Sequence, residues 1–122
     1  MAIVERYRKF SPREIEKDID LRGAVERYLY LLAQATIDLG ESLIAYKGYR
    51  KPATMCEVFQ ILHEEKIIDR ALLESMVQMT GFRTIIAHDY ADINYEVVHS
   101  ILQQRLPDIE AFLAAARGII NA

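Results

Sequence analysis

The chain has 122 residues, a formal net charge of −3 and a sequence pI near 5.6, which argues against a protein that coats nucleic acid through a general basic field. Its single cysteine, Cys56, cannot form an intrachain disulfide, and no apolar run approaches the roughly 20 residues needed to cross a bilayer. We therefore expect one soluble domain over residues 1–122, in the reducing cytoplasm and without a membrane partner.

The amino-terminal part predicts an arm followed by a long helix. Residues 1–10 are charged without clear periodicity, and we expect an arm that is frayed or docked on a neighbour. Ser11, Pro12 and Glu14 have the pattern of a capping box and predict the start of the helix. Apolar residues at steps of three and four predict one helix of about thirty residues: Leu21, Val25, Tyr28, Leu32, Ala35, Leu39 and Leu43. Gly40 within it predicts a slight bend or a close helix approach.

Basic and aromatic residues alternate where this helix breaks, at Lys47, Tyr49, Arg50 and Lys51. Cations neutralise phosphates and aromatic rings stack on bases, so these four residues are a candidate contact for single-stranded RNA or for a partner. The alternative, which we favour, is a solvated loop whose Lys and Arg side chains interact with the carboxyl end of the long helix.

Three further helices follow. Thr54–Glu57 forms a second capping box, Asp69 caps the next helix, and Asp92 or Asn94 starts another. Pro107 marks a kink or a fresh start in the last one. Nothing alternates with a period of two, so no sheet is expected. The predicted fold is all-α, an up-and-down bundle of four to five helices.

Groups able to act on a phosphate cluster in one stretch, between Gly81 and Tyr90. Arg83 carries a permanent fork of donors, and His88 is the side-chain type whose unperturbed pKa lies near neutrality. On an ideal helix, positions five apart are separated by about 140° around the axis and about 7.5 Å along it. Either the helix ends near Ala87 and His88 swings out, or partner groups come from a second copy of the chain.

Each of these residues also has a structural interpretation. Arg83 could pair with Asp38 or Glu26 of the long helix. His88 could bond carbonyl groups at a helix end, and Tyr90 could simply bury its ring. The occurrence of all three together favours a site. The other histidines have no ligands at metal spacing, so neither a metal nor a cofactor is expected.

The pattern Arg83-x4-His88-x-Tyr90 resembles the signature of the HEPN superfamily, and within it the HepT-like toxins encoded beside a minimal nucleotidyltransferase antitoxin. Where that family usually has Asn after the arginine, this sequence has Thr84. Further blocks that resemble the family extend over most of the chain: Ala24-Val25-Glu26-Arg27, Ala35-Thr36-Ile37-Asp38, Pro52, Glu57-Val58-Phe59 and Gly81-Phe82-Arg83.

The resemblance implies a homodimer whose paired motifs face each other in a cleft. It implies a metal-independent endoribonuclease, with Arg83 and His88 as catalytic residues and Thr84 and Asp89 in support. It further implies a cognate nucleotidyltransferase antitoxin that neutralises the toxin by AMP transfer to Tyr90. RNA is the expected substrate, and DNA is not. The alternatives are a subunit that holds a nucleotide or substrate for such a nucleotidyltransferase without cleaving anything, and a helical dimerisation module.

Overall fold

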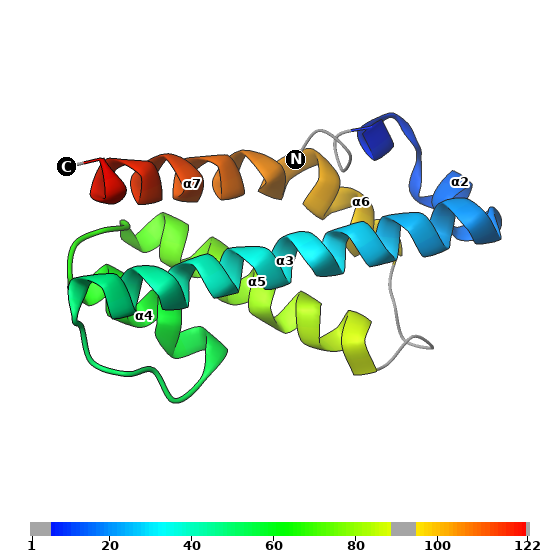
Figure 1. Cartoon of the computed structure of the whole chain (residues 1–122). Helices are drawn as coiled ribbons and strands as arrows, with labels where there is room; N and C mark the ends of the chain where they lie inside the picture. The colour runs from blue at the N-terminus through cyan, green and yellow to red at the C-terminus, as the bar shows by residue number, and fades with distance from the viewer. Residues whose placement is uncertain (1–5, 89–94, 122) are drawn as a thin grey trace.

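Every regular element that the computed structural model describes, over residues 6–88 and 95–121, is helical (Figure 1). The long helix α3 contacts α2, α4 and α5, and α7 packs on α5. The elements are η1 (Arg6–Lys9), α2 (Pro12–Lys17), α3 (Ile19–Lys47), α4 (Met55–Glu64), α5 (Arg70–His88), α6 (Tyr95–Ser100), the π-helical turn η3 (Ile101–Arg105) and α7 (Leu106–Ile120). The predicted all-α bundle is confirmed.

Two caps start the helical stretch at the amino terminus. The Ser11 hydroxyl accepts from the Glu14 N–H over 3.2 Å, and the Glu14 carboxylate accepts from the Ser11 N–H over 3.1 Å, so the predicted capping box forms. It opens only the six residues of α2, because Asp18 is extended (φ −91°, ψ 109°) and its carboxylate accepts from the N–H groups of Asp20 and Leu21. Such local bonds compete with a helix. The prediction of one continuous helix from Ser11 is therefore wrong, and α3, with 29 residues, starts after Asp18.

The buried face of α3 differs in part from the predicted stripe. Val25 and Leu43 are buried as expected, but Tyr28 and Ala35 are exposed. The positions buried between Val25 and Leu43 are Glu26, Leu29, Ala33, Thr36, Ile37 and Gly40. Apolar residues occur on several sides of this helix, so their spacing alone does not identify the inward face.

Gly40 marks a close approach of α3 to α4. A Cβ atom added at Gly40 would lie 2.6 Å from Cγ1 of Val58, a separation that would force a neighbouring group to move. The absence of a side chain lets the two helices approach. The close approach predicted at Gly40 is confirmed.

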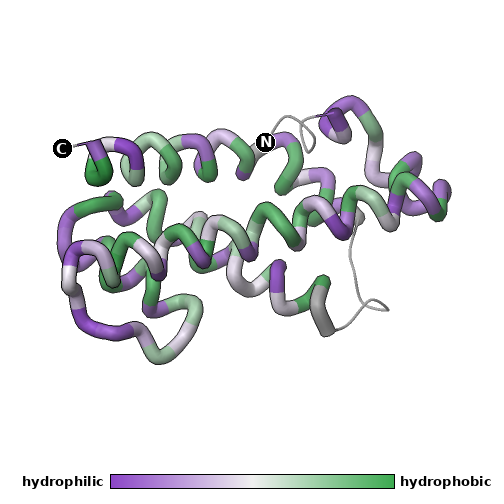
Figure 2. The backbone as a smooth tube through the Cα atoms, viewed as in Figure 1, coloured by the Kyte–Doolittle hydropathy of each residue, from purple (hydrophilic) through white to green (hydrophobic). Residues whose placement is uncertain are grey.

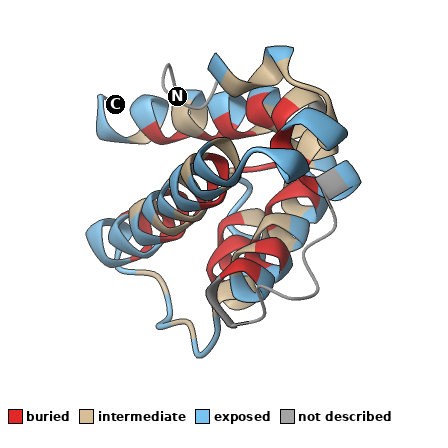
Figure 3. Cartoon of the chain, turned by 90° about the vertical axis from the view of Figure 1, so that its right-hand side faces the viewer, coloured by how far each residue is buried: buried red, intermediate tan, exposed pale blue. Residues whose placement is uncertain are grey.

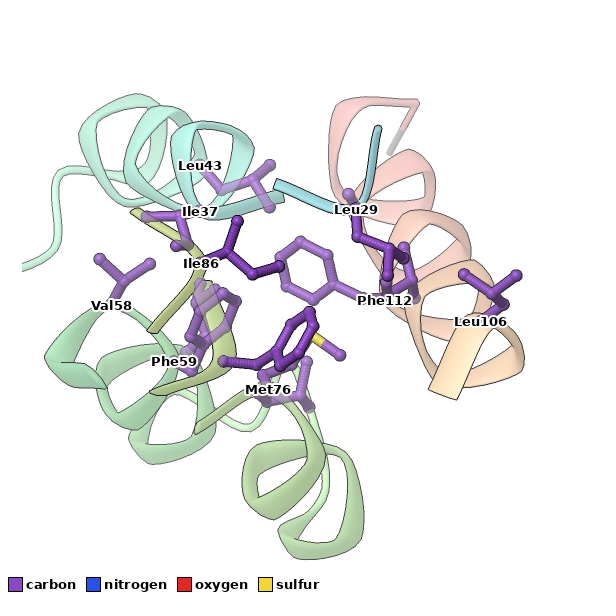
Figure 4. Close-up of a cluster of buried hydrophobic side chains, with 14 of the residues drawn as sticks. Leu29, Ile37, Leu43, Val58, Phe59, Met76, Ile86, Leu106 and Phe112 are labelled. Carbon is purple, nitrogen blue, oxygen red and sulfur yellow. The ribbon is translucent and has the colours of Figure 1, made fainter. Parts of the chain in front are cut away.

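Buried apolar side chains from α3, α4, α5 and α7 form one core. Apolar and polar segments alternate along the helices (Figure 2), and the buried residues lie on the sides that face one another (Figure 3). Within the core the rings of Phe59 and Phe112 meet edge to face, with centroids 5.5 Å apart (Figure 4). The buried Ser75 hydroxyl donates to the Asp108 carboxylate over 2.6 Å and ties α5 to α7. This core fixes α5 against α3.

Pro107 lies just after the π-helical turn and leaves a carbonyl group to which the arm can bond. Proline has no N–H, so it cannot bond the carbonyl of Gln103 four residues earlier. The Arg8 guanidinium donates to that carbonyl over 3.2 Å, and the Gln103 amide donates to the Arg8 carbonyl. The described part of the arm, Arg6–Phe10, is therefore docked on the same chain.

Two other predicted helix starts are confirmed. The Thr54 hydroxyl accepts from the Glu57 N–H at the start of α4, and the Asp69 carboxylate accepts from the Leu72 N–H at the start of α5. The start predicted at Asp92 or Asn94 lies outside the described residues. Among the helices of the described ranges, none combines the length and apolar character that a membrane span requires.

Candidate active site

Arg83 lies on α5 and reaches across to α3. Its Nε donates to the side-chain oxygen of Gln34 over 2.8 Å, and its Nη2 donates to the hydroxyl of Tyr30 over 3.1 Å. The guanidinium carbon lies 5.1 Å from the centre of the Tyr30 ring, within the range of a cation–π contact. Arg83 is half-buried, so its cation is held in place but remains accessible from outside the bundle.

The positive charge of Arg83 is not neutralised by any carboxylate in the described part of the chain. Its two partners, the Gln34 amide and the Tyr30 hydroxyl, are neutral. None of the ion pairs described within residues 6–88 and 95–121 joins Arg83 to Asp38 or Glu26, the structural pairing considered from the sequence. An uncompensated, partly buried arginine is a strong attractant for an anion.

Asp38 is linked to Arg83 through the side-chain amide of Gln34. The Gln34 amide nitrogen donates to the Asp38 carboxylate over 2.9 Å, while the Gln34 oxygen faces Arg83. Tyr30 and Gln34 were not predicted as site residues from the sequence. The available signal was their spacing, because Tyr30, Gln34 and Asp38 are four residues apart and form one polar row on α3.

His88 is the last residue of α5, so the helix continues through the whole interval between Arg83 and His88. This end lies one residue after Ala87, near which the sequence predicted it. The backbone positions of Arg83 and His88 are therefore about 140° apart around the helix axis. The side chain of His88, and Asp89 and Tyr90 as a whole, lie outside what the structure describes.

Thr84 is exposed, and its hydroxyl donates to the carbonyl of Thr80 in its own helix over 3.0 Å. This is the usual back-bonding of a helical threonine. The hydrogen of Thr84 is thus engaged locally, and its oxygen remains the group that could accept from a ligand.

Arg50 in the basic loop is paired with two carboxylates of α4. Its Nη1 lies 2.8 Å from Glu57 and its Nη2 lies 3.0 Å from Glu64. These hydrogen bonds raise the pKa of Arg50, and the bond from Arg50, together with the Ala53 N–H, lowers the pKa of Glu57. Arg50 pairs with α4 rather than with the carboxyl end of α3, which corrects the solvated-loop interpretation for this residue.

The other basic-loop residues remain at the surface of the same end of the bundle. Lys47 and Lys51 are exposed, and Tyr49 is half-buried against the core. Gly48, at φ 70°, ends α3, and the Tyr49 N–H donates to the carbonyl of Ile44. Lys47 is about 20 Å along α3 from Gln34. Figure 1 shows this loop at the end of the molecule opposite the carboxyl end of α5, so one chain does not bring it to Arg83.

A cavity of about 320 Å³ opens between α3, α5 and the segment from α6 through η3 to the start of α7, lined mainly by apolar side chains such as Leu29, Met76 and Phe82. Arg83 does not line it. In the described ranges, His, Cys, Asp and Glu side chains nowhere gather in a group of three suited to a metal ion.

The sequence matches, over residues 1–116, the family described as "Ribonuclease HepT-like". The chain belongs to the ribonuclease HepT-like family. The match spans the amino-terminal arm, the long helix α3 and the motif from Arg83 to Tyr90. The resemblance inferred from the sequence is therefore confirmed.

Relatives of this HepT-like chain include a curated protein and several solved structures. The mRNA nuclease HepT of Shewanella oneidensis is 26% identical over 100 residues, which cover 82% of this chain and 75% of the relative. The tri-AMPylated HEPN toxin of the same organism, solved in complex with its MNT antitoxin, has a TM-score of 0.80 at 23% identity, covering 96% and 92% of the two chains. A mutant MntA-HpeT toxin–antitoxin structure gives 0.82 at 23% identity, covering 96% and 94%. These structures share the fold of this chain.

Proposed function

We propose that this chain is a metal-independent endoribonuclease, the toxin of a toxin–antitoxin pair, with Arg83 and His88 as its catalytic residues. The observation that carries the proposal is the state of Arg83, a half-buried cation held by two neutral groups, with no carboxylate partner in the described ranges, five residues before His88. Such a cation suits a phosphate. The family and the mRNA nuclease relative support cleavage over the non-cleaving subunit.

Cleavage of an RNA phosphodiester without a metal needs three groups. A base removes the proton of the 2′-hydroxyl, and the 2′-oxygen attacks phosphorus. An acid protonates the 5′-oxygen as the bond from phosphorus to that oxygen breaks, and a cation stabilises the charge on the phosphate oxygens. Arg83 serves as the cation. A positioned histidine contributes about 10²–10⁴-fold to the rate of such a step.

Base and acid come from two copies of His88, one from each chain of a homodimer. Because α5 is helical from Arg83 to His88, the two backbone positions of one copy lie about 140° apart around its axis. A two-fold axis beside the carboxyl end of α5 would place the motifs of two copies on opposite walls of one cleft. Thr84 and Asp89 support this site, and Lys47, Tyr49 and Lys51 remain candidate contacts for RNA or for the partner.

The partner is a cognate nucleotidyltransferase that silences the toxin in the cytoplasm. The Tyr90 hydroxyl attacks the α-phosphorus of ATP, AMP becomes attached to the tyrosine oxygen, and pyrophosphate leaves. The added phosphate brings negative charge two residues from His88, where the RNA phosphate binds. The related tri-AMPylated toxin and its antitoxin support this regulation.

The deciding experiment is an RNA cleavage assay with purified chain in the presence of EDTA. Wild type should cleave, whereas Arg83→Ala and His88→Ala should lose at least about 10²-fold in rate with unchanged circular dichroism and melting temperature. Arg70→Ala is the matched control, because Arg70 lies on the same helix and is paired with Glu74 at the surface. Inhibition by EDTA, or an Arg83→Ala variant as active as Arg70→Ala, would contradict the proposal.

Modification is tested with the partner, ATP and Mg²⁺. The intact mass of the wild-type chain should increase by one or more AMP units, and that of Tyr90→Phe should not change. The modified chain should no longer cleave RNA. AMP that still attaches to Tyr90→Phe would assign the acceptor to another residue.

A further inference from the structure

The guanidinium of Arg83 has two edges, and α3 occupies one of them. In this planar fork, Nε and Nη2 share one edge, and Nη1 and Nη2 share the other. Nε donates to Gln34 and Nη2 donates to Tyr30, so the first edge is filled. No described residue accepts from Nη1, so the second edge is the one that can receive a bidentate anion.

We propose that Tyr30 and Gln34, with Asp38 behind Gln34, are positioning residues that fix Arg83 so that only its Nη1–Nη2 edge meets a phosphate of the RNA. This inference rests on the proposed function. It adds to the motif three residues of α3, none of which touches the substrate.

Asp38 determines which way the Gln34 amide faces. A carboxylate can only accept hydrogen bonds, so Gln34 turns its nitrogen to Asp38 (2.9 Å) and must turn its oxygen to Arg83 (2.8 Å). Had the amide the opposite orientation, its N–H groups would meet the N–H of Arg83. The exposed Asp38 thereby acts on Arg83 without neutralising it.

Tyr30 holds the guanidinium in two ways. Its hydroxyl accepts from Nη2 over 3.1 Å, and its ring lies 5.1 Å from the guanidinium carbon. Both contacts are made by a neutral side chain, so the full charge of Arg83 is available to the phosphate. An arginine held before the substrate binds loses less rotamer freedom on binding. We expect loss of either partner to cost about tenfold in RNA affinity.

The first test reads Arg83 directly, by NMR of the full chain. In wild type the Nε–H of Arg83, assigned by its disappearance in Arg83→Lys, should give a resolved signal that exchanges slowly with water. Gln34→Met, which preserves volume and helix propensity, should lose this signal. Gln60→Met, at an exposed position on α4, is the control and should keep it.

The second test is a double-mutant cycle on RNA affinity, measured on the His88→Ala background so that the oligonucleotide stays intact. Gln34→Met and Tyr30→Phe should each weaken binding about tenfold when Arg83 is present and have no effect when it is Ala. Asp38→Asn should give a smaller loss, because an Asn amide allows either orientation of Gln34. Tyr46→Phe, on the exposed end of α3, should change nothing.

Different results would contradict the positioning role of Tyr30 and Gln34 and the proposed function on which that role rests. Equal losses with and without Arg83 would mean that Gln34 and Tyr30 act on the fold, and would overturn the inference, as would an unchanged Nε–H signal in Gln34→Met. If wild type does not cleave RNA and Arg83→Ala binds it as well as wild type, the proposed function fails instead. The NMR signal then still decides whether α3 holds Arg83.

Discussion

The side-chain oxygen of Gln34 lies 2.8 Å from Nε of Arg83, and it is a neutral acceptor. A carboxylate at that place would hold the same edge of Arg83 but would cancel its charge. We therefore predict that Gln34→Glu lowers kcat/KM for RNA about tenfold or more, equivalent to about 1.4 kcal/mol, with little change in melting temperature. Gln60→Glu adds the same charge at an exposed site on α4 and serves as the control. If both variants lose the same amount of kcat/KM, the cause is the added net charge and not the neutralisation of Arg83.

Replacing Gly40 or Gly23 by alanine should have opposite effects on the stability of the fold, although both residues lie in α3. The methyl group of Gly40→Ala would meet Val58 Cγ1 at 2.6 Å, whereas a Cβ at Gly23 has no atom within 4 Å. Gly40→Ala should lower the free energy of unfolding by about 1–3 kcal/mol. Gly23→Ala should raise it by about 0.5–1 kcal/mol, because Ala favours a helix over Gly. Urea denaturation measures both. If Gly40→Ala is as stable as Gly23→Ala, the helices can separate without cost.

The stability of the folded chain should depend on pH through the carboxyl group of Glu57. Its pKa is lowered in the folded chain, first by the hydrogen bond from Arg50 and then by the Ala53 N–H. A lowered folded pKa gives stability that is present above the ordinary value of about 4.3 and is lost as the pH falls through the folded pKa. Glu57→Gln should therefore melt at a lower temperature than wild type at pH 7, and the two melting temperatures should converge as the pH falls through the folded pKa of Glu57. Glu65→Gln, which removes an exposed carboxylate nearby, is the control for the loss of one negative charge.

The elements with local signals were predicted well. The caps at Ser11, Thr54 and Asp69 each bond an N–H within four residues, so the printed sequence contains both partners. Asp18 uses the same chemistry, but it stands inside an otherwise continuous helical pattern, and the sequence does not show that its carboxylate wins over the backbone.

The candidate site was predictable only along one helix. The motif identified Arg83, whereas its partners Tyr30 and Gln34 lie about fifty positions earlier and meet it only through the packing of α3 on α5. Arg50 shows the same limit. Its ion pairs with Glu57 and Glu64 depend on the turn that brings the loop back to α4. The charged residues of the loop sequence do not reveal that turn.

The last prediction concerns the shared cleft. If each site needs His88 from two chains, as base and as acid, a dimer of one wild-type and one His88→Ala chain is inactive. When equal amounts are mixed, unfolded and refolded together, about one quarter of the dimers contain two wild-type chains. RNA cleavage should then fall to about one quarter of that of the same total amount of refolded wild type, and light scattering at micromolar concentration should show a dimer. The same chains mixed without exchange should retain about half the activity, because the wild-type dimers stay intact. A His99→Ala chain in place of His88→Ala provides the matched control and should cause no loss. A linear fall with the fraction of His88→Ala after exchange would mean that each chain acts alone, and a monomer in light scattering would exclude the composite site altogether.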